Sequence, residues 1–443
     1  MTTSRILVGD CIEMLATLPD DSVHCVVTSP PFWQLRDYKV PPTIWPAIDF
    51  SPMPGLPPVP VGAQTVELGL ELDPWAFVGH IVHVFRQVRR VLRPDGTLWL
   101  NMGDTYASSG RGGGGSYMAE RGDASWRGKS RINGFRSAPA GMNRKDMMGM
   151  PWRIAFALQA DGWVLRAENV LHKIAAMPES VQDRPTKAHE PVFLFAKGPR
   201  YYYDPDAVRE PVTGGAHTRG GGVGGKTVPP GRGQQGRVRN NESFGSAVRE
   251  LVTSRNLRSV WEVRPEAYAG DHHATFGPSV PRRCILAGSS AAGCCSACGA
   301  PYRRRIEVDG PSFNEQTKGR EPSKYAEGSL GNPHSYAVRG SHNVIRRVRR
   351  TVGWQPSCEC GVWLEYAGRA ATVPCTVLDP FAGSGTTGAV AVTHGRGFVG
   401  IELSAGHAAE ALDRIAAARE AAGLATVEEP GREPVQLGLL GPD

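Results

Sequence analysis

The residues best suited to chemistry are Thr28-Ser29-Pro30-Pro31-Phe32-Trp33, which follow the apolar run 23–27. An apolar run that stops at a small hydroxyl residue predicts a buried strand ending at a sheet edge. Each proline fixes φ and lacks an N–H, so this loop presents carbonyl oxygens with few competing donors. Acceptors beside the flat Phe32 ring suit a planar group that carries an exocyclic amine, such as a nucleobase. The alternative for this stretch is a rigid turn after a strand.

A second stretch with chemical potential is Asp379-Pro-Phe-Ala-Gly-Ser-Gly-Thr-Thr387, between a predicted strand at 377–378 and a small-residue helix at 388–392. A strand, a glycine loop and a helix N-terminus form a nucleotide-binding layout, because glycine permits close approach and the helix end favours an acceptor-rich ligand. No lysine follows the second glycine, so this is not a phosphate-gripping P-loop. The next predicted strand, 397–401, ends at Glu402, an acid placed to accept from both hydroxyls of a ribose.

Strands and helices alternate along the chain, which predicts a parallel sheet with helices on both faces. Strands are expected at 5–8, 23–27, 97–101, 163–171 and 191–196, and helices from Ile12, from Asp73-Pro74 and over 150–160. The proline-rich stretch 39–63 is predicted to be a loop over the site rather than an element. Asp10, at the end of the first strand, is either a ligand contact or a turn and cap residue.

The cysteines indicate a metal site. Nine are present, too few for a disulfide scaffold in a chain of 443 residues. Cys295-x-x-Cys298 and Cys358-x-Cys360 are each followed by glycine, so both thiolates of a pair can turn toward one ion, with Cys294 as a substitute for Cys295. The spacing predicts a structural zinc site, since four thiolates leave no open position for catalysis; unrelated free thiols are the alternative.

Net charge and composition indicate which classes of partner the protein can bind. A formal charge of +7 fits a polyanionic partner. Two Gly/Arg-rich segments, 106–142 and 213–256, are predicted to be mobile without a partner; the second matches a phosphate-tracking surface, or else a soluble disordered insert. The N-terminus lacks a signal-peptide pattern and no apolar run approaches membrane-spanning length, which favours a soluble cytoplasmic protein with no membrane contact.

Together these motifs resemble the bacterial and phage S-adenosylmethionine-dependent DNA amino-methyltransferases. Asp379–Thr386 with Gly400-Ile401-Glu402 is similar to their cofactor-binding half, and Thr28–Phe32 is similar to their catalytic loop. The catalytic loop precedes the cofactor loop, which is the order of the permuted beta class. Three further segments resemble this class: His272-His-Ala-Thr-Phe-Gly-Pro278, Leu100-Asn-Met-Gly-Asp-Thr-Tyr106, and Met177-Pro-Glu-Ser180 with Asp183-Arg-Pro-Thr-Lys-Ala-His-Glu190.

The resemblance implies an α/β fold with a doubly wound, mostly parallel Rossmann-like methyltransferase sheet in circularly permuted motif order, carrying flexible inserts and a small zinc-ribbon-like insert. It implies methyl transfer from S-adenosylmethionine to an exocyclic amine of a flipped-out base in double-stranded DNA. Serine before the two prolines favours N4 of cytosine, with N6 of adenine as the alternative. A catalytically weak or inactive DNA-binding protein on the same fold is the rival of another class. The Arg-rich inserts and the permuted order disfavour an RNA or protein-glutamine substrate.

The resemblance assigns site residues position by position. The expected catalytic residues are Ser29, Pro30, Pro31 and Phe32. The expected cofactor-binding residues are Asp10, Cys11, Thr28, Phe276, Asp379, Phe381, Gly383, Ser384, Gly385, Thr386, Thr387 and Glu402. The segment Leu171-His-Lys-Ile-Ala-Ala176 departs from the family pattern, in which an aromatic residue at 171 and Pro-Asn near 174–175 help to wall the base pocket.

Six predicted regions complete this interpretation. They are a catalytic half at 1–205 with the insert 106–142, a DNA-recognition insert at 206–258, a cofactor-flanking segment at 259–293, a zinc-ribbon insert at 294–361, a cofactor-binding half at 362–424 and a disordered tail at 425–443. The expected partners are double-stranded DNA and, as a further candidate, a cognate restriction endonuclease. Both a monomer and a homodimer are compatible with the sequence.

Overall fold

The computed structural model describes residues 4–107, 138–176, 178–211, 254–264, 277–309, 348–360, 363–364, 369–370, 372–424 and 435–436. The chain divides into two compact units, the first comprising 1–208, 258–303 and 356–443, and the second comprising 209–257 and 304–355. Phe276 and most of the two Gly/Arg-rich segments lie outside the described residues.

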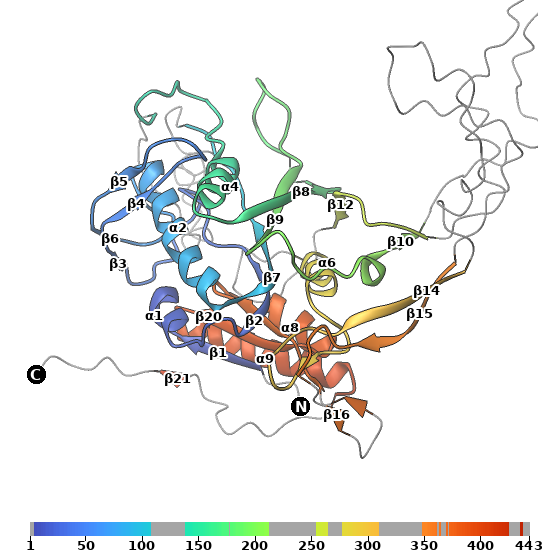
Figure 1. Ribbon diagram of the computed structural model, residues 1–443. Coiled ribbons are helices and arrows are strands. Elements are labelled where there is room, and N and C mark those ends of the chain that lie inside the picture. The colour runs from blue at the N-terminus through green and yellow to red at the C-terminus, as the bar shows by residue number, and fades with distance from the viewer. Residues whose placement is uncertain are drawn as a thin grey trace, which may run out of the picture. The chain divides into compact units, whose positions relative to one another are not determined.

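A nine-stranded sheet forms the centre of the first unit (Figure 1), in the order β12-β8-β9-β7-β2-β19-β20-β1-β21. Neighbouring strands are parallel except at β9, which runs antiparallel to both β7 and β8. The prediction of a mostly parallel α/β sheet is therefore confirmed. The strands are β1 (Ser4–Val8), β2 (Val23–Thr28), β7 (Leu92–Asn101), β8 (Val164–Lys173), β9 (His189–Ala196), β12 (Val260–Val263), β19 (Thr376–Asp379), β20 (Gly397–Glu402) and β21 (Val435–Gln436).

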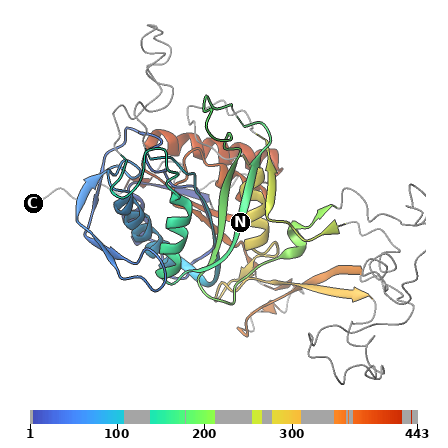
Figure 2. The ribbon, with the colours of Figure 1, turned by 90° about the horizontal axis from the view of Figure 1, so that it is seen from above.

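Helices cover both faces of this sheet, as Figures 1 and 2 show. One face carries α1 (Cys11–Ala16), α2 (Pro74–Val91) and α4 (Met150–Ala160). The other carries α6 (Ser279–Gly288), α8 (Thr386–Thr393) and α9 (Ala405–Ala421). This two-sided cover explains why β2 is buried along its whole length and reads as a continuous apolar run in the sequence.

Helix α2 shows how local sequence sets an element. The Asp73 side chain accepts a hydrogen bond from the Trp75 N–H at 3.0 Å, and Pro74 occupies the first turn. Phe77, Ile81 and Phe85 recur at helical spacing and are fully buried. Cap and apolar stripe both match the sequence prediction for this helix.

The proline-rich stretch differs from its prediction as a loop. It forms two antiparallel pairs, β3 (Thr43–Trp45) with β6 (Gln64–Val66), and β4 (Ile48–Phe50) with β5 (Val59–Val61). The prediction was wrong because the prolines masked a period-two pattern: Ile48 and Phe50 are buried while the residue between them is exposed. The hairpins cover part of the core under α2.

Several short pairs complete the described chain. In the first unit, β13 (Cys294–Cys295) pairs with β18 (Thr372–Val373), and β16 (Trp363–Leu364) pairs with β17 (Arg369–Ala370). In the second unit, β10 (Glu210–Pro211) pairs with β11 (Ser254–Arg255), and β14 (Arg303–Asp309) pairs with β15 (Val348–Gln355). In the predicted tail, the two described residues pair as β21 with β1. None of the described helices is both long and apolar enough to cross a lipid bilayer.

Candidate active site

Sheet order brings the two chemically promising loops together. Strand β19 lies between β2 and β20, with Val377 beside Cys25 and Leu378 beside Val26. Because parallel strands end at the same edge, the loop after β2 and the loop after β19 open on one side of the sheet. A cavity of about 700 Å³ lies there, a size suited to a small ligand.

Most of the predicted site residues line this cavity. All four expected catalytic residues do so. Thr28 and Gly385 do not line it, and Phe276 lies outside the described residues. The expected cofactor residues at its surface are Asp10, Cys11, Asp379, Phe381, Gly383, Ser384, Thr386, Thr387 and Glu402.

Asp379 ties the two loops to each other. Its carboxylate accepts hydrogen bonds from the Thr28 hydroxyl at 2.7 Å, the Thr387 hydroxyl at 2.7 Å and the Phe381 N–H at 3.1 Å. Burial raises the pKa of Asp379 to about 6, and it outweighs the opposing effect of these three donors. The Asp379 carboxylate thus holds the end of β2 against the loop 379–387. Because the Thr28 hydroxyl is bonded to this buried carboxylate, Thr28 lies behind the residues that line the cavity.

The glycine loop needs its glycine at 385. Gly385 has φ +74°, and a Cβ there would lie 2.8 Å from the Cβ of Ala411 on α9. Glycine therefore lets the loop pass against α9 and start α8, whose first turn faces the cavity through Thr386 and Thr387. A helix N-terminus at this position favours acceptor-rich ligand groups.

Glu402 is held at the end of β20 by two backbone donors. Oε2 accepts from the Gly383 N–H and Oε1 accepts from the Ser404 N–H, both at 2.9 Å. Burial acts to raise the pKa of Glu402, but hydrogen bonding from His407 and from these two N–H groups holds it below its usual value. A carboxylate has about four acceptor positions, so this ionised group retains capacity for a ligand hydroxyl.

Asp10 has the cap role that the sequence left open, and its role as a ligand contact stays a prediction. Oδ1 accepts from the Ile12 N–H at 2.8 Å and caps α1, and Oδ2 accepts from the Thr43 hydroxyl at 2.7 Å. Asp10 and its neighbour Cys11 also line the cavity. Burial raises the pKa of the Cys11 thiol well above its usual value, so the thiol is neutral near pH 7.

The Ser29 hydroxyl is oriented by Asn101, a residue that sequence reasoning did not select individually. Ser29 Oγ donates to Asn101 Oδ1 at 3.2 Å, and Asn101 Nδ2 donates to the Pro191 carbonyl at 3.0 Å. The bond to Pro191 fixes which end of the amide faces Ser29. The serine hydrogen is therefore engaged, and the oxygen lone pairs remain for a donor in the cavity.

Phe32 and the residues after it are braced from behind. A Cβ on Gly103 would lie 2.5 Å from the Phe32 ring, so the ring packs directly on this backbone. The Glu71 carbonyl accepts from Trp33 Nε1 at 2.8 Å and from Gln34 Nε2 at 2.6 Å. The fully buried Glu71 side chain in turn lies 2.7 Å from His80 Nδ1. The loop is thus a rigid surface rather than a free tip.

The cavity wall at 171–176 differs from the family pattern in composition but not in position. Leu171, Ala175 and Ala176 all line the cavity. Strand β12 adds Val263 and Arg264 to the same wall, since Val263 pairs with Lys173 of β8. Leucine at 171 and alanine at 175 are smaller than the aromatic residue and the asparagine that the family pattern has there.

Sequence reasoning missed several other lining residues. Lys187 and Glu190 stood in a charge-dense loop between predicted strands, which was the available signal. Asn101 and Lys173 lay in segments that the family resemblance had marked, 100–106 and 171–176, but neither segment indicated which of its side chains would face the cavity. The polar or charged side chains missed individually are Arg36, Tyr38, Thr43, Glu67, Asn101, Lys173, Lys187, Glu190, Arg264 and His407.

The two cysteine pairs meet away from this cavity. The ligand atoms of Cys295, Cys298, Cys358 and Cys360 all lie within 4.8 Å of one another. Backbone hydrogen bonds from Cys298 and Ala297 lower the pKa of Cys295 to about 7, which favours a thiolate. These are the four residues that the spacing predicted, and four converging sulfurs fit a tetrahedral zinc ion.

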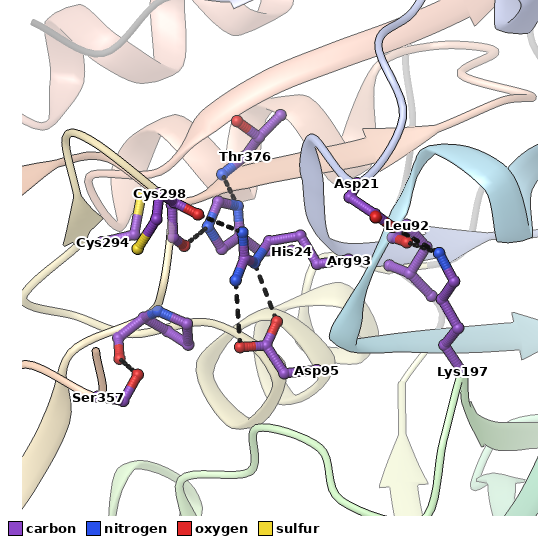
Figure 3. Close-up of polar contacts among 12 residues, drawn as sticks. Asp21, His24, Leu92, Arg93, Asp95, Lys197, Cys294, Cys298, Ser357 and Thr376 are labelled. Carbon is purple, nitrogen blue, oxygen red and sulfur yellow. Dashed lines mark hydrogen bonds and ion pairs between the residues drawn. The ribbon is translucent and has the colours of Figure 1, made fainter. Parts of the chain in front are cut away.

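Cys294 belongs to a different group, with His24 and Cys375, all buried. Figure 3 shows His24 bonded on both sides: Nδ1 accepts from the Thr376 N–H at 3.0 Å, and Nε2 lies 2.8 Å from the Gly299 carbonyl. Burial lowers the pKa of His24 to about 4, so the ring is neutral and donates through Nε2. With both nitrogens engaged, His24 joins the cysteine turn to the sheet and is not a metal ligand.

Comparisons with known proteins agree with this geometry. The DNA methylase family, which covers N6 and N4 amino-methyltransferases, matches residues 23–294 and 375–413. Type II methyltransferase M.XycI of Xanthomonas campestris pv. cyanopsidis is 37% identical over 64% of this chain and 72% of its own length. Type II methyltransferase M.SmaI of Serratia marcescens is 34% identical over 66% of this chain and 78% of its own.

Among solved structures, the PvuII DNA methyltransferase (cytosine-N4-specific) aligns with a TM-score of 0.45 and 13% identity, covering 93% of this chain and 87% of the other. That likeness is too weak to bear on identity. The family match spans both loops of the cavity and well over half of the chain, and the relatives match at 34–37% identity. The chain therefore belongs to the DNA methylase family and is an S-adenosylmethionine-dependent DNA amino-methyltransferase.

Proposed function

We propose that this enzyme methylates N4 of a cytosine that is flipped out of double-stranded DNA. The observation that carries the proposal is that the Ser29 and Pro30 loop and the Asp379 and Glu402 loops line one cavity. A methyl acceptor and a methyl donor held in these loops would face each other. Serine before the two prolines favours cytosine over adenine in this family.

The proposed chemistry starts from a poor nucleophile, because the lone pair of an exocyclic amine is delocalised into the ring. Ser29 Oγ, whose own hydrogen is directed to Asn101, accepts one amine hydrogen, and the Pro30 carbonyl accepts the other. These bonds favour a pyramidal nitrogen with an available lone pair. The nitrogen would attack the sulfonium methyl of bound S-adenosylmethionine in line, the carbon–sulfur bond would break with its electron pair staying on the sulfur of the departing thioether, and the methylated amine would lose a proton to water. Positioning and electrostatics supply most of the rate.

Cofactor binding is assigned to the loops after β1, β19 and β20. S-adenosylmethionine supplies the electrophilic methyl when bound. The Glu402 carboxylate would accept from the ribose hydroxyls, and the α8 N-terminus with Thr386 and Thr387 would face polar cofactor atoms. Asp379 would act by holding the loops, since its oxygens already accept three hydrogen bonds.

The acceptor base must leave the duplex, because its amine is paired there. Phe32, fixed on the Gly103 backbone, offers the stacking surface. Leu171, Ala175 and Ala176 line the part of the cavity in which we place the base. A cognate endonuclease and the choice between monomer and homodimer stay predictions.

Mass spectrometry of nucleosides from unmethylated DNA, incubated with enzyme and S-adenosylmethionine, tests the proposal. We expect N4-methylcytosine with the wild type and its loss in Ser29→Ala. Ser22→Ala is the matched control, because it removes a hydroxyl bonded to the Pro19 carbonyl outside the cavity. N6-methyladenine would keep the mechanism and overturn the base assignment. Tight cofactor binding with no methylated base on diverse DNA would favour an inactive DNA-binding protein.

We further propose that Cys295, Cys298, Cys358 and Cys360 bind one structural zinc ion. The support is the mutual approach of their sulfurs within 4.8 Å. Elemental analysis of protein purified without added metal should find about one zinc per chain. Cys360→Ser should lower that content, whereas Cys284→Ser, which changes a buried cysteine outside the group, should not. Wild-type protein containing only a small fraction of one ion per chain would contradict the zinc assignment.

A further inference from the structure

Charge is segregated within the cavity. Its carboxylates on the β1, β19 and β20 side, Asp10, Asp379 and Glu402, are all engaged by hydrogen-bond donors of the protein. The wall beside β8, β9 and β12 carries three cations, Lys173, Lys187 and Arg264, and one carboxylate, Glu190. In the sheet, β2 lies between these two sets of strands, so the catalytic loop separates the cofactor side from the cationic side.

Lys187 is the most constrained of these cations. Its side chain is only 18% exposed and lines the cavity, and its ion partner, Asp104, has Oδ2 at 4.0 Å, beyond hydrogen-bond distance. Asp104 Oδ1 is already used by the Thr105 and Met150 N–H groups. Burial lowers the pKa of Lys187. Among the described residues the ammonium has no hydrogen-bond acceptor, so it is a partly desolvated cation with donors to spare.

Arg264 is brought to the same wall by strand pairing. Val263 lies beside Lys173, and its carbonyl accepts from the Ile174 N–H at 3.2 Å, which fixes the end of β12. The Arg264 side chain is exposed and has no partner within the described part of the chain. Lys173, by contrast, pairs with Glu190. After that pair is set aside, the remaining cations of this wall are Lys187, whose ion partner Asp104 lies 4.0 Å away, and Arg264; these two residues are termed the rim cations.

We propose that the rim cations bind the phosphodiester groups that flank the flipped-out nucleotide. This inference rests on the proposed base-flipping function. A nucleotide whose base enters the cavity must bring its sugar–phosphate backbone close to the cavity. Lys187 and Arg264, which line the cavity on the base side of the catalytic loop, would then donate hydrogen bonds to its phosphate oxygens. The cofactor also carries an anion, its amino-acid carboxylate, but the rim cations lie on the far side of β2 from the cofactor-type loops.

Salt-dependent binding to a short duplex with one central mismatched cytosine, whose base flips at low cost, tests the proposal by fluorescence anisotropy. The variants are Lys187→Ala, Lys187→Arg and Arg264→Ala. Arg166→Ala is the control, because Arg166 is an exposed cation of β8 that donates to the Tyr201 hydroxyl and does not line the cavity. S-adenosylmethionine affinity is measured by calorimetry on each variant.

We expect Lys187→Ala and Arg264→Ala each to weaken duplex binding and to reduce the slope of log K against log salt by about 0.9, the value for one phosphate contact. Lys187→Arg should keep the slope, and cofactor affinity should not change. If Lys187→Ala and Arg264→Ala gave the same slopes as wild type and Arg166→Ala, the proposal would be overturned. Weaker cofactor binding with normal duplex binding would overturn it in favour of the cofactor carboxylate. Neither result depends on methyl transfer, so failure of the proposed reaction would be seen separately in the nucleoside assay.

Discussion

At the scale of single residues, the site depends on which atom of a side chain faces which partner. Ser29 can serve as an acceptor because Asn101 takes its hydrogen, and Asn101 can do so because the Pro191 carbonyl holds its amide nitrogen. An amide bonded at both ends has one orientation, and that orientation is transmitted to the serine.

Asn101→Ala is expected to lower kcat by about 10²-fold, because the Ser29 hydroxyl loses its orienting partner and misplaced groups cost rates of this order. Cofactor affinity should be unchanged, as measured by calorimetry beside single-turnover methylation. Asn169→Ala is the matched control, since Asn169 is also buried and also donates to a β9 carbonyl, that of Val192 at 3.1 Å. Equal loss of kcat in both variants would indicate a general effect of destabilisation.

Asp379 predicts a pH dependence of stability. Its pKa is about 6 in the folded protein because of burial, against about 4 in an unfolded chain. The folded state thus binds the proton more tightly. Its contribution to the unfolding free energy is fully present below pH 4 and is lost as pH rises through about 6, by about 3 kcal/mol in total.

Asp379→Asn removes this titration. Urea unfolding at a series of pH values should therefore show wild type losing about 2 kcal/mol relative to Asp379→Asn between pH 4 and pH 7. Two curves that run parallel over this interval would show that the three donors to Asp379, not burial, set its pKa.

At the scale of elements, the catalytic loop is shaped by segments distant in sequence. Gly103, after β7, gives the Phe32 ring a backbone to rest on. The 67–71 segment holds Trp33 and Gln34 through the Glu71 carbonyl, and the buried contact of Glu71 with His80 fixes that segment to α2. Strand and helix together therefore determine where the stacking surface lies.

Gly103→Ala is expected to displace the Phe32 ring, because the new Cβ would lie 2.5 Å from two ring carbons. Methylation kcat/KM should fall by about 10²-fold, the scale of a small misplacement at a reacting site, with cofactor binding retained. Gly198→Ala is the control, since its Cβ would meet only the Pro94 carbonyl at 3.9 Å. Normal activity of Gly103→Ala would argue against base stacking on Phe32.

At the scale of the whole first unit, the cysteine group is attached to the same strands that carry the catalytic loop. His24 of β2 binds the Gly299 carbonyl, and Arg93 of β7 donates to the Cys298 carbonyl at 2.8 Å while pairing with Asp95 (Figure 3). β2 and β7, the strands whose carboxyl ends carry Ser29 and Asn101, therefore also hold the turn that contains Cys295 and Cys298.

Chelation of the proposed zinc is therefore expected to lower the Tm of the whole first unit by several degrees, because metal binding contributes folding free energy and the turn is bonded to β2 and β7. Differential scanning calorimetry with and without a chelator measures this. Zinc should restore the Tm and magnesium should not, since thiolates select zinc. An unchanged Tm after verified zinc removal would show that the turn folds independently of the sheet.

Elements with local signals could be predicted from the sequence. A buried strand reads as a continuous apolar run, a helix cap such as Asp73-Pro74 lies beside its helix, and the loops 28–33 and 379–387 each follow their own strand. Those local signals were sufficient to predict the sheet class and the four converging cysteines, whereas the permuted order was implied by the resemblance to the beta class. They failed at 39–63, where prolines hid short alternating strands.

Which distant residues share the cavity depends on how the strands pack, and it could not be predicted from the sequence. Asn101, Lys187 and Arg264 belong to three segments, and no local pattern connects them; the sheet order and the β8–β12 register bring them together. The same holds for Asp10, whose cap role is local but whose bond to Thr43 depends on a hairpin. Local conformation follows from neighbouring residues, whereas a site is a set of side chains that only packing places within reach of one ligand.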